Sequence, residues 1–529
     1  MALVTVAEHQ YASPPYYNGT MRKILITTAL LIAVLSSGQA SLQAQGTTQP
    51  EMAGQTVIGP RILSMEDVIR LAQENSISAM TNRNIFAASY WQYRSFKAQY
   101  LPSLNLNGNL ANFNRSLITL QDYNTGAIRY AENYNMSNDL TLSIRQNIAL
   151  TGGTLSLSTS LQRLDQFGQQ RLTNWYAQPI YLSYMQQLWG YNSLKWDKKT
   201  EPQNYEIAKR QYLENMESVT ISAADCFWNL NAAKVSYENA LQSFEESKRL
   251  YKAAQTRFQM GTITRDNLLQ LELRMLNDSL AIQSQKVSLR SAQNTLCSYI
   301  GYQEDTELTL TISYAIPDIL LNYDEVLEKA LENSSFNLSQ EVSKVEAERS
   351  VAQAKANRGI SASVNARFGL SNDGDTFNKA FIGLKDQEVV GVSFSVPIAD
   401  WGLGEGRVKM AKAQAETQKS RLEQSLADYR QNLFVQVMQF NNQRSQCEIS
   451  KRAAQIAEES YELALRNFGS GAMSVTDLNQ LQSNRDNARN TYENNVRNFW
   501  SQYFNLRKTT LYDFISGTDI SAEFDRIVK

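Results

Sequence analysis

The sequence predicts a chain of mixed α and β structure in which very long paired helices are joined to short strands with one apolar and one polar face. Two runs without glycine or proline, residues 203–260 and 407–468, are long enough for helices of about 90 Å. Segments that alternate apolar and polar residues lie between the helical runs, as expected for strands. Both kinds of segment occur twice along the chain, so we expect two similar halves.

Matching residues support an internal two-fold sequence repeat. The helix opening at residues 67–76 matches residues 325–334 at an offset of 258, and the segment at 251–271 matches 461–481 at an offset of 210. Because the offset falls from 258 to 210, the first half has 48 more residues than the second, placed between about 115 and 186. A fixed spacing between similar segments is the signature of a duplicated unit.

The repeat divides the chain into consecutive parts. The first repeat is expected at 62–300, with strands at about 101–188 and a long helical hairpin at about 203–300. The second is expected at 324–516, with strands at about 359–397 and a helical hairpin at about 407–516. The remaining parts are an N-terminal extension with a signal peptide, a linker and a C-terminal tail: 1–44, 301–323 and 517–529.

The beginning of the chain has the pattern of a secretory signal. The basic segment that opens at Met21 is followed by an apolar run from Ile24 to Leu35 and by small residues that suit cleavage near Ala40 or Ala44. The apolar run is short for a membrane-spanning helix. Residues 1–20 are expected to be an upstream extension, either not made or removed. The pattern predicts an exported protein.

The composition excludes several classes of function. The sequence has 529 residues, 51 Lys and Arg against 52 Asp and Glu, three cysteines, and one histidine, His9, which lies before the expected cleavage site. A mature chain without histidine cannot use a histidine dyad or triad, or bind zinc through histidine. Near-neutral charge gives no basic surface for nucleic acid. No later stretch is long and apolar enough for a membrane-spanning helix. We expect no cofactor, no metal and no enzyme activity, although carboxylate chemistry is not excluded.

The two long helical runs are expected to turn back on themselves. Glycine interrupts them at Gly261 and at residues 469–471, which suits tight turns between helices. Thr264 and Ser474 are well placed to cap the returning helices. Coiled-coil spacing predicts a packing seam on each outgoing helix. In the first run the seam residues are spaced alternately four and three apart: Cys226, Leu230, Ala233, Tyr237, Ala240, Phe244, Ser247, Tyr251, Ala254 and Phe258. In the second run they recur every seven residues: Leu433, Phe440, Cys447, Ala454, Tyr461 and Phe468.

The alternating segments suit strands with a membrane on one side and water on the other. They lie at about 103–110, 140–145, 155–161 and 390–396. A soluble sandwich with one exposed face would show the same alternation. Aromatic residues gather where strands meet helices, as at a membrane–water boundary, although core packing is the alternative. The expected interface aromatics are Trp91, Tyr100, Trp189, Tyr191 and Trp401.

The order of these features resembles the TolC family of outer-membrane efflux proteins over nearly the whole mature chain. The residues that carry the resemblance are four short motifs: Tyr-Leu-Pro-Ser-Leu at 100–104, Val-Pro-Ile-Ala-Asp-Trp-Gly at 396–402, Phe-Gln-Met-Gly-Thr at 258–262 and Phe-Gly-Ser-Gly at 468–471. The resemblance implies a homotrimeric outer-membrane β-barrel continued by a long periplasmic α-helical barrel. It also implies a passive duct without covalent chemistry.

The resemblance further implies partners and a location. The strands would lie in outer-membrane lipid and the helices in the periplasm. A periplasmic adaptor (a membrane fusion protein) and an inner-membrane transporter of the RND or ABC type would deliver small molecules or proteins, as in tripartite efflux or type I secretion. The alternative reading is a secreted coiled-coil scaffold or adhesin without channel activity.

The family closes its periplasmic end with acidic rings and polar links, which the resemblance places at the helix tips of this chain. Asp477 matches the first of two family aspartates, whereas the second position holds Gln480 and a family arginine falls on Met473. Asp477 could instead only favour the first turn of its helix. The tip residues implied by the resemblance and the turns are Gly261, Thr264, Arg265, Asp266, Gly471, Ser474, Asp477 and Gln480.

Two features of the first half have alternative interpretations: the form of its surplus residues and the state of its cysteines. The 48 surplus residues contain the turn signal Thr151-Gly152-Gly153 and could form an extra hairpin, giving four strands in the first half and two in the second, or a long loop. Cys226 and Cys297 lie 35 residues before and 36 after Gly261, so a disulfide between them could form at equal height on the hairpin, with Cys447 free and buried.

Overall fold

The computed structural model describes residues 61–121, 126–167, 171–303, 306–470 and 472–520. All of them belong to one compact unit that spans residues 60–529. The signal peptide and the upstream extension, predicted at 1–44, lie outside the described residues.

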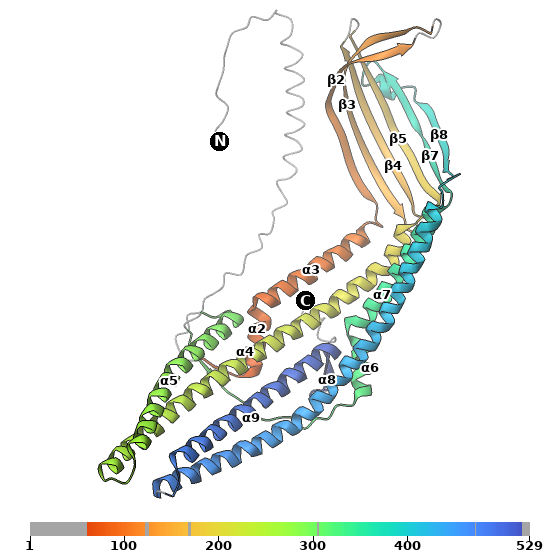
Figure 1. The fold of residues 1–529 in the computed structure, drawn as a ribbon. Helices are drawn as coiled ribbons and strands as arrows, with labels where there is room; N and C mark the ends of the chain where they lie inside the picture. The colour runs from red at the N-terminus through yellow and green to blue at the C-terminus, as the bar shows by residue number, and fades with distance from the viewer. Residues whose placement is uncertain (1–60, 122–125, 168–170, 304–305, 471, 521–529) are drawn as a thin grey trace, which may run out of the picture. The chain divides into compact units, whose positions relative to one another are not determined.

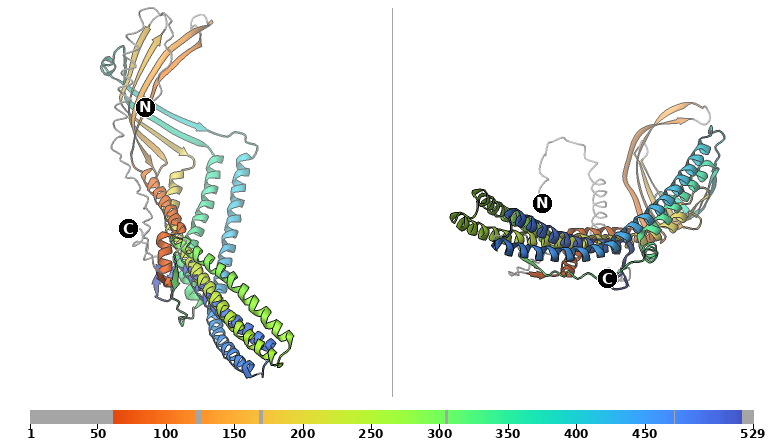
Figure 2. Two further views of the ribbon diagram at one scale, coloured as in Figure 1. Left: turned by 90° about the vertical axis from the view of Figure 1, so that its left-hand side faces the viewer. Right: turned by 60° about the horizontal axis from the view of Figure 1, so that its bottom comes forward.

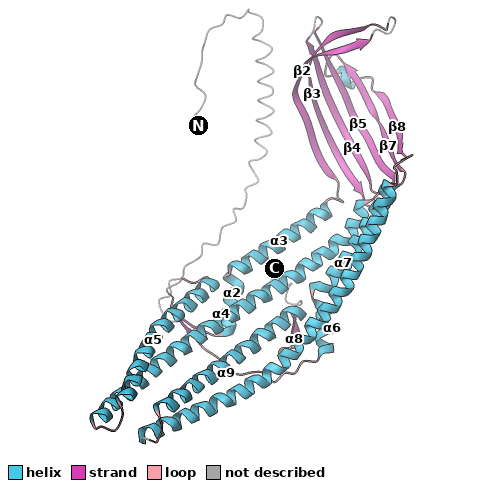
Figure 3. Ribbon diagram, viewed as in Figure 1, coloured by secondary structure: helices cyan, strands magenta, loops and turns pink. Residues whose placement is uncertain are grey.

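The described chain runs through the same order of elements twice, with helices and strands well separated (Figures 1 and 3). In each half a short strand, two helices, a set of long strands and a long helical hairpin follow one another. The first half contains β1 (Arg61–Leu63), α2 (Met65–Asn75), α3 (Ile77–Ala98), β2 (Ser103–Gln121), β3 (Ile128–Ile148), β4 (Gly153–Phe167), β5 (Arg171–Trp189), α4 (Ser193–Gln259) and α5 (Arg265–Ile300). The second contains β6 (Leu308–Leu310), α6 (Tyr323–Asn333), α7 (Ser335–Arg358), β7 (Ser361–Gly374), β8 (Lys385–Ser395), α8 (Leu403–Ser470) and α9 (Val475–Thr510). The short elements η1 (Lys379–Phe381), β9 (Tyr512–Asp513) and β10 (Thr518–Asp519) complete the fold.

Six long strands form one antiparallel sheet in the order β2-β3-β4-β5-β7-β8. The pairing of β5 with β7 joins the two halves of the chain in one sheet. Four strands come from the first half and two from the second, so the surplus residues form an extra hairpin and not a long loop. The short strands β1 and β6 pair in parallel and join the beginnings of the two halves.

The turn between β3 and β4 is fastened to the neighbouring helices and strands by side-chain amides. Gln146 and Asn147 donate to the main-chain oxygens of Tyr100 and Gln99 at the end of α3, at 2.8 and 3.1 Å. Asn192, the cap of α4, donates to the oxygen of Ala149 at 3.2 Å. These bonds satisfy main-chain oxygens at the turn and at the end of α3, and they fix the β3–β4 hairpin to the ends of the two neighbouring helices.

The long helices lie side by side (Figure 2). Toward the tips the contacts run α5–α4–α9–α8, and next to the sheet they run α3–α4–α7–α8. The core therefore lies between neighbouring helices. It is filled by aromatic and aliphatic side chains that are fully buried, among them Phe227, Phe440, Phe499, Tyr503, Leu296 and Ile300.

The long helices begin earlier than the sequence predicted. Helix α4 starts at Ser193 and runs through Pro202, and α8 starts at Leu403 and includes two glycines in its first turn and a third near its end. Proline removes one main-chain hydrogen bond and glycine weakens a helix, but a helix of 67 or 68 residues that packs along its length tolerates both. The predicted boundaries at 203 and 407 were therefore wrong.

The predicted packing seams describe the second half better than the first. Leu433, Phe440, Cys447 and Tyr461 of α8 are all buried. On α4 the seam accounts for only some of the buried residues: Val235 and Leu250 are buried outside it, whereas Phe258 within it is 41% exposed. Helix α4 contacts both α5 and α9, so it buries two faces, and a single seam could not describe it.

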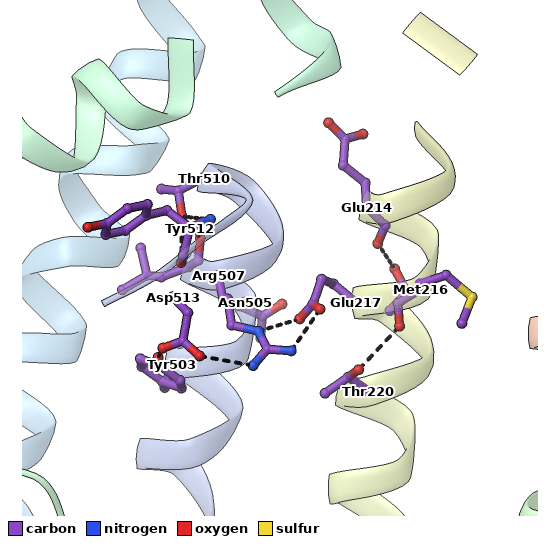
Figure 4. A network of polar contacts seen from close by, with 12 residues as sticks. Glu214, Met216, Glu217, Thr220, Tyr503, Asn505, Arg507, Thr510, Tyr512 and Asp513 are labelled. Carbon is purple, nitrogen blue, oxygen red and sulfur yellow. Dashed lines mark hydrogen bonds and ion pairs between the residues drawn. The ribbon is translucent and has the colours of Figure 1, made fainter. Parts of the chain in front are cut away.

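A buried ion pair ties the first half to the end of the second (Figure 4). Arg507 of α9 donates through Nε and Nη2 to the two carboxylate oxygens of Glu217 on α4, at 2.7 and 2.8 Å. Glu217 is 3% exposed. Arg507 also lies 3.5 Å from Asp513, which accepts a hydrogen bond from the Tyr503 hydroxyl. A two-pronged bond of this kind fixes the rotation of α9 against α4 as well as their distance.

Asp513, the carboxylate at the edge of this network, has a lowered pKa. Burial would raise the pKa of Asp513, but hydrogen bonds from Tyr503 and from the main-chain N–H groups of Ser516 and Ile515, with the charge of Arg507, outweigh it. A lowered pKa means that the stability contributed by Asp513 is complete above its ordinary pKa of 3.8 and is lost as the pH falls through the lower value of the folded state.

We expect Glu217→Leu to lower the free energy of unfolding by about 3–5 kcal/mol, because Arg507 would remain buried without its main partner. The double variant Glu217→Leu with Arg507→Met should regain most of this loss. Glu238→Gln is the matched control, since Glu238 forms an exposed pair with Lys234 at 3.9 Å and its loss should cost about 0.5 kcal/mol. Thermal unfolding followed by circular dichroism measures all three. Equal effects of Glu217→Leu and Glu238→Gln would contradict the role of the buried pair.

Candidate functional site

One face of the six-stranded sheet is apolar and uncovered. The strand registers place Leu104, Ile144, Leu157, Leu182 and Phe368 in one row across five strands. Each of these side chains is between 40 and 66% exposed. On β8 the same face carries Val390, Val392 and Phe394, which are 62, 63 and 75% exposed. An apolar surface of this extent marks contact with another apolar phase.

The opposite face of the sheet is polar and more enclosed. Ser143 and Ser158 face each other across β3 and β4, and Ser158 is 7% exposed. Ser160 donates to Gln178 at 3.0 Å, and Gln178 donates to Gln387 on β8. The sheet is curved (Figure 2), and crowding of the polar side chains is what the inner side of a curved sheet produces. The sheet thus separates an apolar outer side from a polar inner side.

The predicted interface aromatics lie near the junction of strands and helices, in two different settings. Trp91, Trp189 and Trp401 are 57, 61 and 97% exposed. Tyr100 instead donates to the main-chain oxygen of Leu194, and Tyr191 accepts a hydrogen bond from Arg349. The tryptophans are therefore free to contact another phase, whereas the tyrosines join helices to one another.

Trp401 is presented by an unusual backbone. Its φ is +54°, and Gly402 follows with a φ of +86°. The Asp400 carboxylate holds this turn by accepting hydrogen bonds from the N–H groups of Gly402 and Gly404, at 3.0 and 2.8 Å. A left-handed conformation is costly for tryptophan, so the turn is fixed by its surroundings and keeps the indole pointing outward.

The two outermost helices of the hairpins carry matching apolar stripes. On α5 the exposed residues Leu273, Leu280 and Val287 lie 8, 15 and 22 residues from Arg265, where the helix begins. On α8 the exposed residues Leu463, Ile456 and Ile449 lie 7, 14 and 21 residues from Ser470, where the helix ends. The two stripes therefore have a seven-residue period and lie at equal heights above the tips.

Both stripes face away from the rest of the chain. Leu273 is two positions after Leu271, which is 1% exposed, and Leu463 is two positions after Tyr461, which is 2% exposed. Two positions turn an α-helix by about 200°. Each stripe is thus on the side of its helix opposite the buried side, at an edge of the helix layer. The groove lined by Val287, Asn294 and Tyr299 lies toward the sheet along the same helix.

The helix tips are built by local capping. Thr264 accepts a hydrogen bond from the N–H of Asn267 at 3.3 Å, and Ser474 accepts one from the N–H of Asp477 at 3.1 Å, so both predicted caps are confirmed. Gly261 has a φ of +73°, which glycine adopts without strain. Gly471 lies outside the described residues.

The charged and amide groups of the tips have mostly local partners. Asp477 accepts a hydrogen bond from the Ser474 hydroxyl at 2.7 Å. Gln480 donates to Asn484 at 3.0 Å, and Asp266 accepts from Gln270 at 2.8 Å. Arg265 is exposed at the first position of α5. In a single chain the tips are therefore capped helix ends with exposed charges.

Sequence reasoning missed a buried polar cluster above the tips. The Tyr461 hydroxyl donates to Glu246 at 2.6 Å, and the guanidinium carbon of Arg485 lies 4.2 Å from the centre of the Tyr461 ring. Burial, followed by the hydrogen bond and charge of Glu246, raises the pKa of Tyr461. The cluster joins α4, α8 and α9. The seven-residue pattern marked Tyr461 only as a packing residue, and nothing local pointed to Arg485.

The three cysteines are free, which corrects the disulfide considered between Cys226 and Cys297. The thiol of Cys297 contacts the main-chain oxygen of Thr306 at 3.6 Å. On α5 it is Tyr299 that reaches α4, by donating to the oxygen of Val219 at 3.3 Å. Equal height on the hairpin was therefore not enough, because Cys297 faces the chain that follows its own helix.

Within the described ranges no group of three or more histidine, cysteine, aspartate or glutamate side chains is placed to hold a metal ion. No helix in the same ranges is long and apolar enough to span a membrane.

One family model matches most of the second half of the chain. Residues 326–510 match the family model described as outer membrane efflux protein. The resemblance to the TolC family of outer-membrane efflux proteins is thereby confirmed. No curated protein matches the chain.

Solved structures share the fold at low sequence identity. The Campylobacter jejuni CmeC outer membrane channel is 14% identical, with 88% of each chain covered and a TM-score of 0.63. The outer membrane protein VceC from Vibrio cholerae is 13% identical over 84% of this chain and 95% of that one, with a TM-score of 0.56. The open state of the Neisseria gonorrhoeae MtrE outer membrane channel is 14% identical over 84% of this chain and 88% of that one, with a TM-score of 0.55.

We expect the thiols of Cys297 and Cys447 to react with a maleimide only after unfolding, because burial raises the pKa of both, that of Cys447 to about 11. Protein that is exported to an oxidising compartment and purified without reductant should have the intact mass expected for three free thiols. A mass lower by two hydrogen atoms would contradict this expectation, because it would show one disulfide, and peptide mapping would then decide whether it joins Cys226 and Cys297.

Proposed function

We propose that this chain, which carries an outer membrane efflux protein domain in residues 326–510, forms a passive duct through the bacterial outer membrane. The observation that carries the proposal is the two-faced sheet, whose uncovered apolar side can meet lipid while its polar side lines a path for solutes. The strands are continued by long helices whose 67 and 68 residues would reach about 100 Å into the periplasm.

The working form is a homotrimer of a chain with a two-fold internal repeat. The stripes on α5 and α8 support this assembly. Both are exposed in a single copy, and they lie at the same height on opposite edges of the helix layer, so the α5 stripe of one copy can meet the α8 stripe of the next. Helix α5 rises from the tip and α8 descends to it, so α5 of one copy and α8 of the next would pack antiparallel with a seven-residue period. Three copies would close the sheets into one barrel and the helices into one tunnel.

The duct needs partners that supply energy and cargo. We propose a periplasmic adaptor of the membrane fusion type and an inner-membrane transporter of the RND or ABC type, as in tripartite efflux or type I secretion. Small molecules or proteins would be the cargo. The exposed Trp91, Trp189 and Trp401 support placement in the outer membrane, since tryptophan favours the boundary between lipid and water. The channel itself needs neither cofactor nor catalytic residue.

The periplasmic end would be controlled at the helix tips. Asp477 lies in the first turn of α9, and in a trimer three copies of it would face a common axis, repel one another and attract cations. Gly261, Thr264, Arg265, Asp266, Gly471, Ser474 and Gln480 would shape the same constriction.

A secreted scaffold or adhesin is the alternative function. A soluble protein of that kind would bury its apolar strand face. The described sheet leaves Leu104, Phe368 and Phe394 at 66, 46 and 75% exposure, which favours the duct.

Reconstitution tests the proposal. Detergent-solubilised full-length protein should be trimeric and should conduct ions across a planar lipid bilayer. A monomer that conducts no ions would overturn the duct.

We expect the double variant Leu273→Asp with Leu280→Asp to lose the trimer while keeping its helix content. Each leucine should contribute about 1.5–3 kcal/mol when buried against a neighbouring copy. Light scattering after size-exclusion chromatography in detergent measures the assembly. The control is Ser288→Asp, which adds charge at an exposed position of α5 outside the stripe. A trimer as stable in the double variant as in the control would remove α5 from the interface.

We expect Asp477→Asn to weaken block by divalent cations and to change single-channel conductance, because it removes three charges from the trimer axis. Asparagine keeps an oxygen that can accept the Ser474 bond, so the helix cap should survive. Ser474→Ala is the complementary control: it removes the cap and keeps the charge. If Ser474→Ala reproduces the change and Asp477→Asn does not, Asp477 acts as a capping residue alone.

A further inference from the structure

We infer that three copies of this chain close a wall of eighteen strands, which makes the membrane part of the duct as wide as its helical part. The inference rests on the proposed function, because it needs the trimer. It bears on the cargo, since the width of the wall sets an upper limit on the solutes that can pass the membrane part of the duct. Each copy contributes the six strands of one sheet, and three such sheets contain eighteen strands.

The added hairpin β3–β4 is an integral part of the wall. Its strands pair without interruption from Asn135 with Gln166 to Ile148 with Gly153. Its apolar residues Ile144 and Leu157 continue the exposed outer row, and its polar residues lie on the enclosed side. A lid or plug would not keep the two-sided alternation of the neighbouring strands.

The hairpin is also fixed at the junction with the helices. Its turn is held by the bonds from Gln146, Asn147 and Asn192, and Gln186 of β5 donates to the oxygen of Thr151 at 2.8 Å. Gly152 has a φ of +76° and lies so close to Asn192 that a Cβ would come within 2.9 Å of that side chain. The turn is therefore fitted to this position and holds β3 and β4 in the sheet.

The two edges of the sheet suit each other. Strands β2 and β8 each pair on one side only, and all their residues except Gln387 are exposed. Strand β2 leaves the helix end of the sheet after α3, and β8 returns to that end before α8. β8 of one copy and β2 of the next would therefore run antiparallel, as do all neighbouring strands within the sheet. An exposed edge of this length is a ready partner for another strand.

The widths of the sheet and of the helix layer agree only when all six strands are counted. Six strands spaced about 4.8 Å apart and tilted by about 40° span about 37 Å. The four helices next to the sheet, α3, α4, α7 and α8, span about 36 Å at about 9 Å between axes. Four strands would span only about 25 Å. With six strands, the trimer passes from strands to helices without a change of radius.

The resulting opening suits large cargo. Eighteen strands give a backbone radius of about 18 Å, and side chains about 5 Å long leave an opening about 26 Å across. Twelve strands would leave about 14 Å. The membrane part of the duct would therefore admit cargo as wide as a polypeptide hairpin or a small folded domain, and the helix tips would set the narrower limit.

Crosslinking between copies tests the strand order. In a background with the three native cysteines replaced by alanine, Val392→Cys on β8 is combined with Leu104→Cys or Leu106→Cys on β2, and as controls with Leu155→Cys or Leu157→Cys on β4. All five positions lie on the apolar face. A bismaleimide should link β8 to β2 into covalent dimers and trimers and should not link β8 to β4. Links from β8 to β4 would overturn the inference, because β2 and β3 would then lie outside the wall.

A strand count on the unmodified protein decides the matter if the cysteine variants fail to fold. Cryo-electron microscopy of the detergent-solubilised full chain should show eighteen strands around the axis. A conducting trimer with fewer strands would overturn this inference and leave the proposed duct intact. A monomer without conductance would overturn both.

Discussion

The structure depends on one constraint: near the tips the helices form a layer that is a single element thick. Such a layer has two faces and two edges, and the apolar side chains at each of them need packing partners. Within one chain, α4 and α9 pack against neighbours on both sides in the middle of the layer, while the apolar stripes of α5 and α8 remain exposed at its edges. The sheet repeats the problem with β2 and β8. A larger core cannot cover the edges, because the described residues form no second layer near the tips. In the proposed trimer, neighbouring copies would cover them.

The interior bonds of the layer explain how a thin structure keeps its shape. Glu217 and Arg507 lock α4 to α9 near the end of the chain, and the Tyr461 cluster joins α4, α8 and α9 closer to the tips. Both sites are polar and buried, so they fix rotation where apolar packing alone would let long helices slide. The edges carry apolar stripes, which would suit surfaces that first meet as separate copies in the proposed trimer.

Local patterns were enough to predict the helical turns, the caps at Thr264 and Ser474 and the two-faced strands. Each of these is determined by residues within a few positions of one another. The extra hairpin was located by comparing the two repeats, and a long loop stayed an alternative until the strands were seen. The buried pairs could not be predicted in this way, since Glu217 and Arg507 are 290 residues apart and Glu246 and Tyr461 are 215 apart. The start of α4 was misplaced for a similar reason: Pro202 reads as a boundary locally, and packing along the whole helix overrides it.

The capping role of Asp477 and its proposed role at the axis are compatible. The carboxylate accepts the Ser474 hydroxyl, and its own N–H donates to Ser474, so the side chain is held in one place at the start of α9. A charge that is free to swing would move away from two like charges and weaken any ring. A charge fixed by the cap stays at the same height in every copy, and in the proposed trimer the cap is therefore what would make three separate carboxylates act as one site for cations.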